Sequence, residues 1–325
     1  ARKVQIDRSW PVFDPVSHGE PTRRNQTMER NTTSPSRRRL DEMTTEVMFP
    51  SDSARLQQVT IDLAGASVAG DERRTNEDRF LIAERCQEGT VHFGESANPG
   101  HTDLLVLIVA DGLGGLEAGE VASDLAVRSL ARRLGSVSSP EEALDPELVR
   151  NAFGEIDDAL HEEGQRRESH MATTCTMASS LWPRALIAHV GDSRCHLVRG
   201  TRLHRITTDH TLAAEVERQL GQPEERLTPL AHVVTRALGS RQGSPAPDLQ
   251  EITLRPGDRL LLCTDGLTDV VDEEEVLSEV EGAGDASTLS RRLLAAAGAR
   301  GGTDDATVVA GLFDLQGKEG ELRSR

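Results

Sequence analysis

Carboxylate side chains recur in this chain where apolar, strand-like segments end. They are the pair Glu77-Asp78, followed along the chain by Asp111, Asp192, Asp265 and Asp304. An unpaired carboxylate at such a position is costly because its charge loses water. Several converging carboxylates also raise one another's proton affinity unless a cation lies among them. Hard divalent ions such as Mg²⁺ and Mn²⁺ prefer these oxygen ligands, so the pattern predicts a two-metal site that cleaves phosphate esters.

Each acidic motif is weak evidence when taken alone, because Asp-Gly is a common solvated turn. The joint order of the motifs, each at the edge of a predicted strand, favours the metal site. The glycine-rich run after Asp111 briefly suggests a dinucleotide-binding loop. However, Glu117 stands where that fingerprint needs Gly or Ala. The glycines instead allow the backbone carbonyl of Gly112 to approach an ion.

Hydrophobic periodicity from Val59 onward predicts the strands and helices that must position these carboxylates. Continuously apolar runs at 104–110 and 260–264 are typical of strands covered on both faces. Strand clusters separated by helix pairs predict an α+β fold, with two packed antiparallel β-sheets flanked by helix pairs as an α-β-β-α sandwich. The expected strands are 59–68, 78–84, 104–110, 172–181, 184–190, 194–199, 202–206, 249–254, 258–264 and 306–313, and the expected helices are 117–134, 146–167, 211–220, 273–281 and 286–299.

Short consecutive strands at 184–190, 194–199 and 202–206 are interpreted as antiparallel hairpins. The sequence Asp145-Pro146 is a good helix start, with an N-cap followed by Pro at the first helical position.

The first 57 residues differ in composition from the rest of the chain. They are rich in Arg, Thr, Ser, Pro and Asn, with ten Lys/Arg against eight Asp/Glu. Such a composition favours disorder, so we predict a disordered extension over 1–57, one domain over 58–315 and a polar tail over 316–325. The extension is either a regulatory tail, with phosphorylatable residues beside the basic run Arg37-Arg38-Arg39, or a solvated leader without a specific task.

The overall composition excludes several functional classes. Net charge is -17, which argues against nucleic acid or an anionic membrane as a partner. Tyr is absent and aromatic residues make up 2% of the chain, so base-stacking side chains are scarce. No run approaches the roughly 20 apolar residues of a membrane-spanning helix. We therefore expect no nucleic-acid and no membrane partner.

The four cysteines also exclude one mechanism. Cys86, Cys175, Cys195 and Cys263 have no C-x-x-C spacing, and three of them lie in apolar segments. Buried reduced thiols fit a cytoplasmic protein. A thiol-based phosphatase would need Arg six residues after a Cys, and the chain has His, Leu, Thr and Asp at those four positions.

Taken together, these motifs resemble the metal-dependent protein phosphatase family, of the protein phosphatase 2C type, in its bacterial form. The resemblance covers roughly residues 60–313. It is carried by 70–80, by Val109-Ala110-Asp111-Gly112, by Met171-Ala172-Thr173-Thr174, by His189-Val190-Gly191-Asp192-Ser193-Arg194, by Thr208-Asp209-His210, by 235–239, by Thr264-Asp265-Gly266-Leu267-Thr268-Asp269 and by Gly302-Thr303-Asp304-Asp305. The resemblance implies that 58–315 is a catalytic domain that hydrolyses phosphoserine and phosphothreonine in proteins, with a hydroxide between two Mn²⁺ or Mg²⁺ ions as the nucleophile.

The resemblance also implies roles for single residues. Asp111 would bridge both ions, and the carbonyl of Gly112 would join the second ion. Asp265 and Asp304 would hold the first ion, whereas Glu77 and Asp78 would bind the second or orient its waters. Asp192 and Asp269 match positions that hold a third, weaker ion in some members. Arg73 would grip the substrate phosphate through its guanidinium fork, with Arg74 as a competing candidate.

Some positions depart from the family pattern. Leu113 stands where animal members carry a His proposed as general acid, which leaves protonation of the leaving group to another donor. The last motif has Asp305 where Asn is usual, and Ala172 replaces a common Gly. His210 is interpreted as structural. The stretch 207–246 is predicted to form a mobile flap near the site, where substrate choice would lie.

Two alternatives stay open at this point. One is the related phosphatase branch that acts on anti-sigma-factor antagonists, although Gly114-Gly115 and the Asp192 motif favour the general serine/threonine branch. The other is an inactive phosphoprotein-binding module, which would require loss of metal ligands. For the favoured enzyme we expect phosphorylated protein substrates, an opposing serine/threonine kinase and a monomer.

Overall fold

The computed structural model describes residues 59–71, 75–85, 91–94, 96–97, 103–113, 118–220, 228–240 and 245–315. Contacts divide the chain into residues 1–56 and 57–325, and every described residue belongs to the second unit. The predicted extension over 1–57, the predicted tail over 316–325 and Arg73 lie outside the described residues. The predicted domain boundary at residue 58 therefore stays a prediction.

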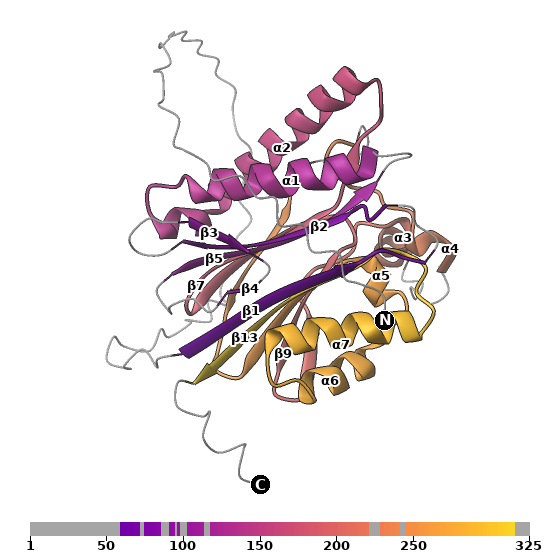
Figure 1. Cartoon of the computed structure of the whole chain (residues 1–325). Coiled ribbons are helices and arrows are strands. Elements are labelled where there is room, and N and C mark those ends of the chain that lie inside the picture. Colours follow the sequence, from indigo (N-terminus) through magenta and orange to yellow (C-terminus); the bar gives the residue numbers. More distant parts are fainter. Residues whose placement is uncertain are drawn as a thin grey trace, which may run out of the picture. The chain divides into compact units, whose positions relative to one another are not determined.

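Two antiparallel sheets form the centre of this unit (Figure 1). The first sheet has seven strands. Six lie in the order β11 (Asp248–Thr253), β8 (Arg184–Val190), β7 (Cys175–Leu181), β5 (Leu104–Leu113), β2 (Asp78–Arg85) and β3 (Val91–Gly94), and β6 (Ala172–Thr173) pairs with the end of β5. The second sheet has six strands in the order β10 (Arg202–Arg205), β9 (Arg194–Arg199), β12 (Asp258–Cys263), β13 (Ala306–Leu315), β1 (Val59–Val68) and β4 (Ser96–Ala97).

A helix pair covers the outer face of each sheet (Figure 1). Helices α1 (Ala118–Gly135) and α2 (Pro146–Arg167) pack on the seven-stranded sheet, and α6 (Glu273–Glu281) and α7 (Ala286–Ala299) pack on the six-stranded sheet. The predicted start of α2 is confirmed, because the Asp145 side chain accepts a hydrogen bond from the Glu147 N–H at 2.8 Å. Shorter segments are a 3-10 turn η1 (Pro140–Leu144), α3 (Leu212–Leu220), α4 (Thr228–Ala231) and α5 (Asp265–Thr268).

The alternating side chains of β5 show how the layers are joined. Leu104, Val106 and Ile108 belong to the core beneath α1 and α2. Leu105 and Leu107 belong to the core between the two sheets. Because both faces of this strand are buried, its sequence shows no polar alternation. The predicted α-β-β-α sandwich is confirmed. Among the described residues, no helix combines the length and apolar character needed to cross a membrane.

One predicted hairpin is wrong. Strands β8 and β9 do not pair, because β8 lies between β7 and β11 whereas β9 lies between β10 and β12 in the other sheet. The chain crosses between the sheets at Gly191, whose φ of 114° is open to glycine. A Cβ there would also lie 2.5 Å from Thr174. The strands at 194–199 and 202–206 do form the predicted hairpin, as β9 and β10.

Two other strand predictions need smaller corrections. The segment 172–181 is divided into β6 and β7 at Thr174, whose N–H bonds to the Asp111 carbonyl at 2.8 Å and whose hydroxyl accepts from the Asp111 N–H. Strand β5 continues through Asp111 to Leu113 rather than ending at Ala110, because β6 pairs with its last residues. Asp111 therefore lies within β5, two residues before its end, and not just after the strand as predicted.

Candidate metal centre

The paired strands β2 and β5 bring the first acidic motifs together. Asp78 and Asp111 are direct partners in the antiparallel register. The Gly112 N–H donates to the Glu77 carbonyl at 3.2 Å, which continues the pairing one residue further. Residues from two motifs that lie more than thirty positions apart thus meet at one end of the seven-stranded sheet.

Asp192 lies in the short crossing between β8 and β9. This residue is 6% exposed. The neighbouring Ser193 hydroxyl contacts the Thr174 hydroxyl at 2.8 Å, and Thr174 is in turn bonded to Asp111. The crossing between the sheets thus places Asp192 next to Asp111 near the end of β5.

The six-stranded sheet supplies the remaining acids. Asp265 is the first residue of α5 and lies two residues after the end of β12, and Asp304 lies two residues before β13. The Thr264 hydroxyl donates to Asp78 Oδ2 at 2.7 Å and accepts from the Thr307 N–H at 2.9 Å. This threonine joins the ends of three strands from the two sheets across the site.

The three side chains of Asp111, Asp192 and Asp265 form what we call the inner cluster. One carboxylate oxygen from each lies within 4.8 Å of the others. Burial raises the pKa of Asp192 to about 8 and that of Asp265 to about 6, with neighbouring carboxylates adding to both shifts. Burial and the charges of four neighbouring acids hold the pKa of Asp111 well above its usual range.

Asp78 shares this environment. The residue is 2% exposed, and burial raises its pKa to about 7, although hydrogen bonds from Thr264 and Thr307 oppose the shift. The raised pKa values reflect first the burial of these carboxylates and then the repulsion among them. A divalent cation would remove the repulsion and allow all of them to ionise.

Two further observations test whether a metal ion would fit. Buried Oδ1 atoms of Asp78, Asp192 and Asp265 have no hydrogen-bond partner among the described residues. Acceptors of this kind are normally satisfied. A Cβ added at Gly119 would lie 2.6 Å from the Gly112 carbonyl oxygen and 2.9 Å from the Glu77 carboxyl carbon. The structure thus leaves oxygen ligands converging on space that a side chain would fill, and the donor set suits Mg²⁺ or Mn²⁺.

Asp305 accepts hydrogen bonds from the backbone beside the metal centre. Its carboxylate accepts from the Gly70 N–H at 2.9 Å and from the Glu77 N–H at 2.8 Å. The Asp305 N–H in turn donates to Asp304 Oδ1 at 2.8 Å. Asp suits this position because each of its two oxygens faces an N–H donor. The sequence marked Asp305 as a departure from the family pattern, but only the structure shows this contact.

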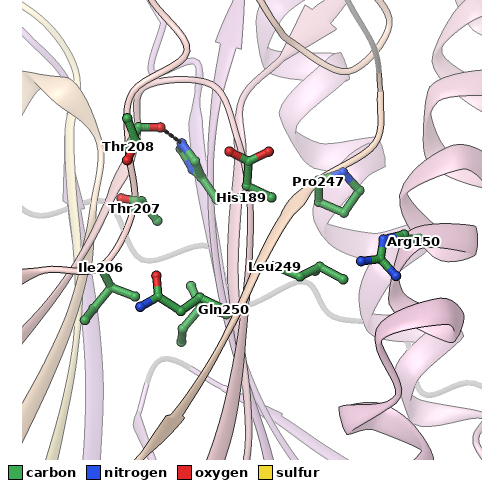
Figure 2. Close-up of a pocket in the computed structure, with 10 residues that line it drawn as sticks. Arg150, His189, Ile206, Thr207, Thr208, Pro247, Leu249 and Gln250 are labelled. Atoms are coloured by element: carbon green, nitrogen blue, oxygen red, sulfur yellow. Dashed lines mark hydrogen bonds between the residues drawn. The ribbon is translucent and has the colours of Figure 1, made fainter. Parts of the chain in front are cut away.

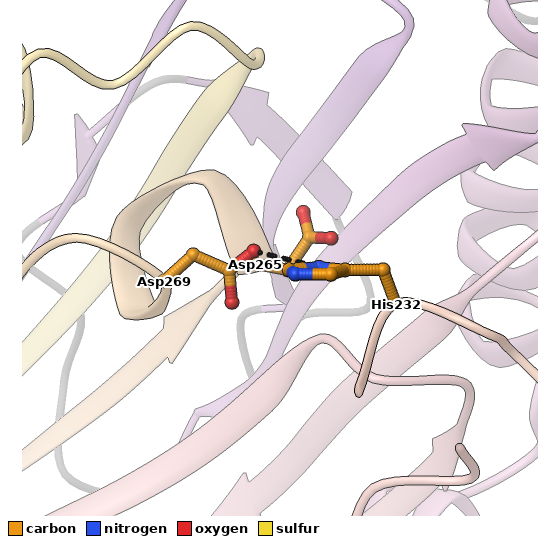
Figure 3. Close-up of side chains that lie close together, drawn as sticks. All are labelled: His232, Asp265 and Asp269. Carbon is orange, nitrogen blue, oxygen red and sulfur yellow. Dashed lines mark ion pairs between the residues drawn. The ribbon is translucent and has the colours of Figure 1, made fainter. Parts of the chain in front are cut away.

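A second group of side chains lies beside the first. We call His232, Asp265 and Asp269 the outer cluster, since one ligand atom from each lies within 4.8 Å of the others. His232 Nδ1 is 3.2 Å from Asp269 Oδ2. Figure 3 shows the imidazole reaching from the loop after α4 toward the two carboxylates at α5. No motif in the sequence marks His232, which lies 33 positions before Asp265.

The base of the predicted flap is tied to the centre by His210. Its Nδ1 accepts from the Gly191 N–H at 3.0 Å, and Gly191 precedes Asp192. Its Nε2 then donates to Asp248 Oδ2 at 3.0 Å. The Thr235 N–H bonds to the His210 carbonyl at 2.7 Å, which holds the returning arm of the segment.

A cavity of about 460 Å³ is lined by residues of β8, β11, α2 and the segment after β10, and by none of the three acids of the inner cluster (Figure 2). His189 lines it, but both ring nitrogens of His189 are engaged, by the Thr176 hydroxyl at 2.8 Å and the Thr208 carbonyl at 3.1 Å. Burial lowers the pKa of His189 to about 3, so this imidazole stays neutral. The cavity therefore offers less chemistry than the inner cluster.

The structure brings most of the predicted site residues together. Asp78, Asp111, Asp192, Asp265 and Asp304 influence one another's charge, and Glu77 lies beside Gly112 at Gly119. Asp269 belongs to the outer cluster and Asp192 to the inner one, both clusters include Asp265, and the charge of Asp269 contributes to the raised pKa of Asp192. Arg73 and Arg74 lie outside the described residues, so the predicted phosphate clamp stays a prediction.

Comparison with known proteins identifies relatives that are protein phosphatases. The model of the family described as "Protein phosphatase 2C" matches residues 75–306. "Protein phosphatase PhpP" of Streptococcus pneumoniae is 32% identical over 210 residues, which is 62% of this chain and 83% of that protein.

Solved structures share the fold. The crystal structure of the Mycobacterium tuberculosis serine/threonine phosphatase PstP/Ppp matches with a TM-score of 0.66 at 30% identity, over 78% of this chain and 99% of that one. A structure of the catalytic domain of PstP in complex with two manganese ions matches with a TM-score of 0.64 at 28% identity, over 79% of this chain and 99% of that one.

Proposed function

We propose, since the chain belongs to the protein phosphatase 2C family, that it is a metal-dependent protein phosphatase that hydrolyses phosphoserine and phosphothreonine. The observation that supports this most directly is the inner cluster, in which three buried or half-buried carboxylates converge with raised pKa values. The relatives named as serine/threonine phosphatases give the same reaction class.

The chain's own residues have distinct tasks in this proposal. Asp111 lies centrally, with Asp265 and Asp304 on the side of the six-stranded sheet and Glu77, Asp78 and the Gly112 carbonyl on the other. Divalent ions held by these oxygens, Mn²⁺ or Mg²⁺, would supply Lewis acidity toward the phosphoryl oxygens and a water nucleophile at neutral pH. Thr264 orients Asp78 through its hydroxyl, and Asp305 fixes the backbone of Glu77.

Protonation of the leaving group needs a donor other than residue 113. Leu113 is apolar and ends β5 beside β6. The seryl or threonyl alkoxide is a poor leaving group at neutral pH without a proton. The donor is therefore a water molecule or a residue from another segment.

Arg73 is proposed to bind the substrate phosphate. Loss of a phosphate clamp that ligates no ion should raise KM, with a further fall in kcat where the guanidinium also binds the transition state. Arg73→Ala and Arg74→Ala form a matched pair, because the two residues are adjacent and identical in type. A raised KM in Arg74→Ala alone would transfer the role to Arg74.

The cellular setting is proposed from the family, the state of the cysteines and the net charge. Phosphorylated proteins are the substrates, a serine/threonine kinase is the opposing enzyme, and the phosphatase acts in signalling as a cytoplasmic monomer. Three buried cysteines without a disulfide among the described residues are consistent with a reducing compartment. The net charge of -17 is unfavourable for binding nucleic acid.

Phosphate release from a phosphothreonine peptide tests the proposal. The full chain should release phosphate only when Mn²⁺ or Mg²⁺ is added, and a phosphotyrosine peptide of the same sequence should react much more slowly. Asp111→Asn is the matched control, because it removes one charge while keeping the shape. A metal-independent reaction, or none in the wild-type protein, would refute the proposed function.

A further inference from the structure

We propose that Arg79 is a positioning residue for Glu77, and that through Arg79 the first turn of α1 sets how tightly the metal centre holds a divalent ion. The inference rests on the proposed function, because it takes Glu77 as one of the residues that hold an ion. It adds a side chain of β2 and its partner on α1, Glu120, to the residues assigned so far.

The guanidinium of Arg79 binds the backbone on both sides of Glu77. Its Nη1 donates to the Asn76 carbonyl at 2.8 Å and to the Asp78 carbonyl at 2.7 Å. Its Nη2 donates to Glu120 Oε1 at 2.6 Å, so one planar group joins this turn to α1. Arginine suits the task because its N–H donors are held in a rigid fork.

Helix α1 contacts Glu77 at two further points. The buried Ser123 hydroxyl donates to the Glu77 carbonyl at 2.6 Å. A Cβ added at Gly119 would lie 2.9 Å from Glu77 Oε1, so the glycine allows the carboxylate to lie directly against the helix. Because α1 packs on the sheet that contains β2 (Figure 1), a single helix contacts the carboxylate, the carbonyl and, through Arg79, the neighbouring carbonyls.

The chain contains a comparable arginine at a distance from the site. Arg259 Nη1 donates to the carbonyl of the preceding residue, Asp258, at 3.1 Å and to Asp314 Oδ1 at 3.0 Å. Like Arg79, it lies on a strand with a partly exposed side chain. Arg259 lies near the start of β12, whereas Asp265 follows the other end of that strand. It therefore reports the cost of losing such an arginine where the metal centre is not involved.

The charge of Arg79 and its hydrogen bonds have opposite effects on an ion. A positive charge close to a divalent cation repels it, and Glu120 only reduces this repulsion. Hydrogen bonds that fix the backbone of Glu77 favour ion binding instead. Arg79→Met removes both the charge and the donors while keeping an unbranched side chain, so the direction of its effect on ion affinity shows which contribution is larger.

Calorimetric titration of the full chain with Mn²⁺ tests the inference without measuring turnover. Arg79→Met should weaken Mn²⁺ binding about tenfold, as is usual when a group that orients a metal ligand is lost. Arg259→Met should bind Mn²⁺ like the wild-type protein, and circular dichroism should show that both variants are folded. Unchanged or tighter binding in Arg79→Met, or an equal loss in Arg259→Met, would overturn the inference.

Two more variants separate geometry from charge and assign the effect to Glu77. Arg79→Lys keeps the charge but replaces the fork with one ammonium group, so it should also weaken Mn²⁺ binding. Unchanged affinity in Arg79→Lys would contradict positioning. When Glu77→Gln is already present, adding Arg79→Met should cause little further loss, since both changes act on one ligand. A full additional tenfold loss would show that Arg79 does not act through Glu77.

Peptide hydrolysis distinguishes this inference from the proposed function. At saturating Mn²⁺, Arg79→Met should keep the KM of the wild-type protein for a phosphothreonine peptide, because Arg79 holds the backbone and not the substrate. A raised KM would make Arg79 a substrate-binding residue and overturn the inference. If the wild-type protein hydrolyses the peptide and Arg79→Met binds Mn²⁺ normally, only this inference fails, whereas an inactive wild-type protein refutes the proposed function.

Discussion

The inner and outer clusters share Asp265 but rest on different supports. The inner cluster takes Asp111 from a central strand, where the Thr174 hydroxyl accepts from its N–H, and Asp192 from the crossing between the sheets, where the next residue, Ser193, contacts Thr174. The outer cluster takes His232 from the loop after α4 and Asp269 from the end of α5. The Asp192 residue is 6% exposed, whereas the side chains of His232 and Asp269 are 60% and 35% exposed.

This difference separates two ways of binding an ion. Burial and then the charges of neighbouring acids raise the pKa values of the inner carboxylates, so a cation there relieves both the loss of water around charge and the repulsion. The exposed pair in the outer cluster is already solvated and screened, so a cation gains less from it. We therefore expect a cation to bind more tightly in the inner cluster than in the outer one.

The largest expected effect comes from breaking the inner cluster. Asp111→Asn should lower kcat for a phosphopeptide by a factor on the order of a thousand, which corresponds to about 4 kcal/mol of barrier. The metal-free variant should stay folded, because removing one acid relieves repulsion. Steady-state kinetics at saturating Mn²⁺, with a thermal melt of the metal-free protein, measures both. Activity near that of the wild-type protein would refute the assignment of Asp111.

A pH series on the metal-free protein should sharpen the comparison. The pKa values of Asp78, Asp192 and Asp265 rise from 3.8 to about 7, about 8 and about 6. Between the unfolded-state and the folded-state pKa values, the folded protein binds more protons than the unfolded chain. The free energy of unfolding therefore falls as the pH rises through the folded-state pKa values. The Tm should fall between about pH 5 and about pH 8, and Mn²⁺ should restore it at the upper end.

Asp192→Asn is the control for that series. It removes one of the titrating groups, so the fall in Tm with pH should become shallower. An identical slope in the two metal-free proteins would mean that the dependence arises from the overall negative charge rather than from the inner cluster.

A smaller effect, on stability, is expected from substituting Asp305, which binds the backbone beside the inner cluster. Asp305→Ala removes the acceptor of the Gly70 and Glu77 N–H groups, and each buried donor left without a partner costs about 1–3 kcal/mol. Asp305→Asn keeps one acceptor oxygen, so its loss of stability should be intermediate. Urea unfolding of the metal-free proteins gives the order. Equal stability of all three would show that these two bonds contribute nothing.

The smallest effect is expected in the outer cluster. An exposed ion pair contributes about 1 kcal/mol or less, so His232→Ala should change the Tm of the metal-free protein by less than about 4 °C. His161→Ala, which breaks a comparable His–Asp pair on α2, should behave alike. A much larger shift in His232→Ala alone would show that this histidine supports the fold.

The sequence predicted the fold well because its core strands are continuously apolar. The segment 104–110 could be assigned to a strand with both faces covered, and this strand carries Asp111. Helix α2 was predicted at its observed bounds because Asp145 and Pro146 mark its start and an apolar stripe follows. The crossing at Gly191 was missed, because a short link between two strands has the same length whether the strands pair or change sheets.

The candidate site was predictable only where acids lie in motifs. Asp78 and Asp111 stand at opposite positions of one strand pair, so their proximity follows from the register. His232 could not be predicted, because its distance from Asp265 depends on how the segment after α3 returns to the site. Likewise, the contacts of Asp305 with two N–H groups depend on loops at 70 and 77, whose conformation has no sequence pattern.

The bond from Thr264 to Asp78 has a consequence for folding kinetics. It joins residues 186 positions apart and lies where the two sheets meet. A site assembled from such distant segments is complete only after both sheets have formed and docked, so its contacts belong to the late side of the folding barrier. Ions bound there should slow unfolding while leaving the refolding rate nearly unchanged.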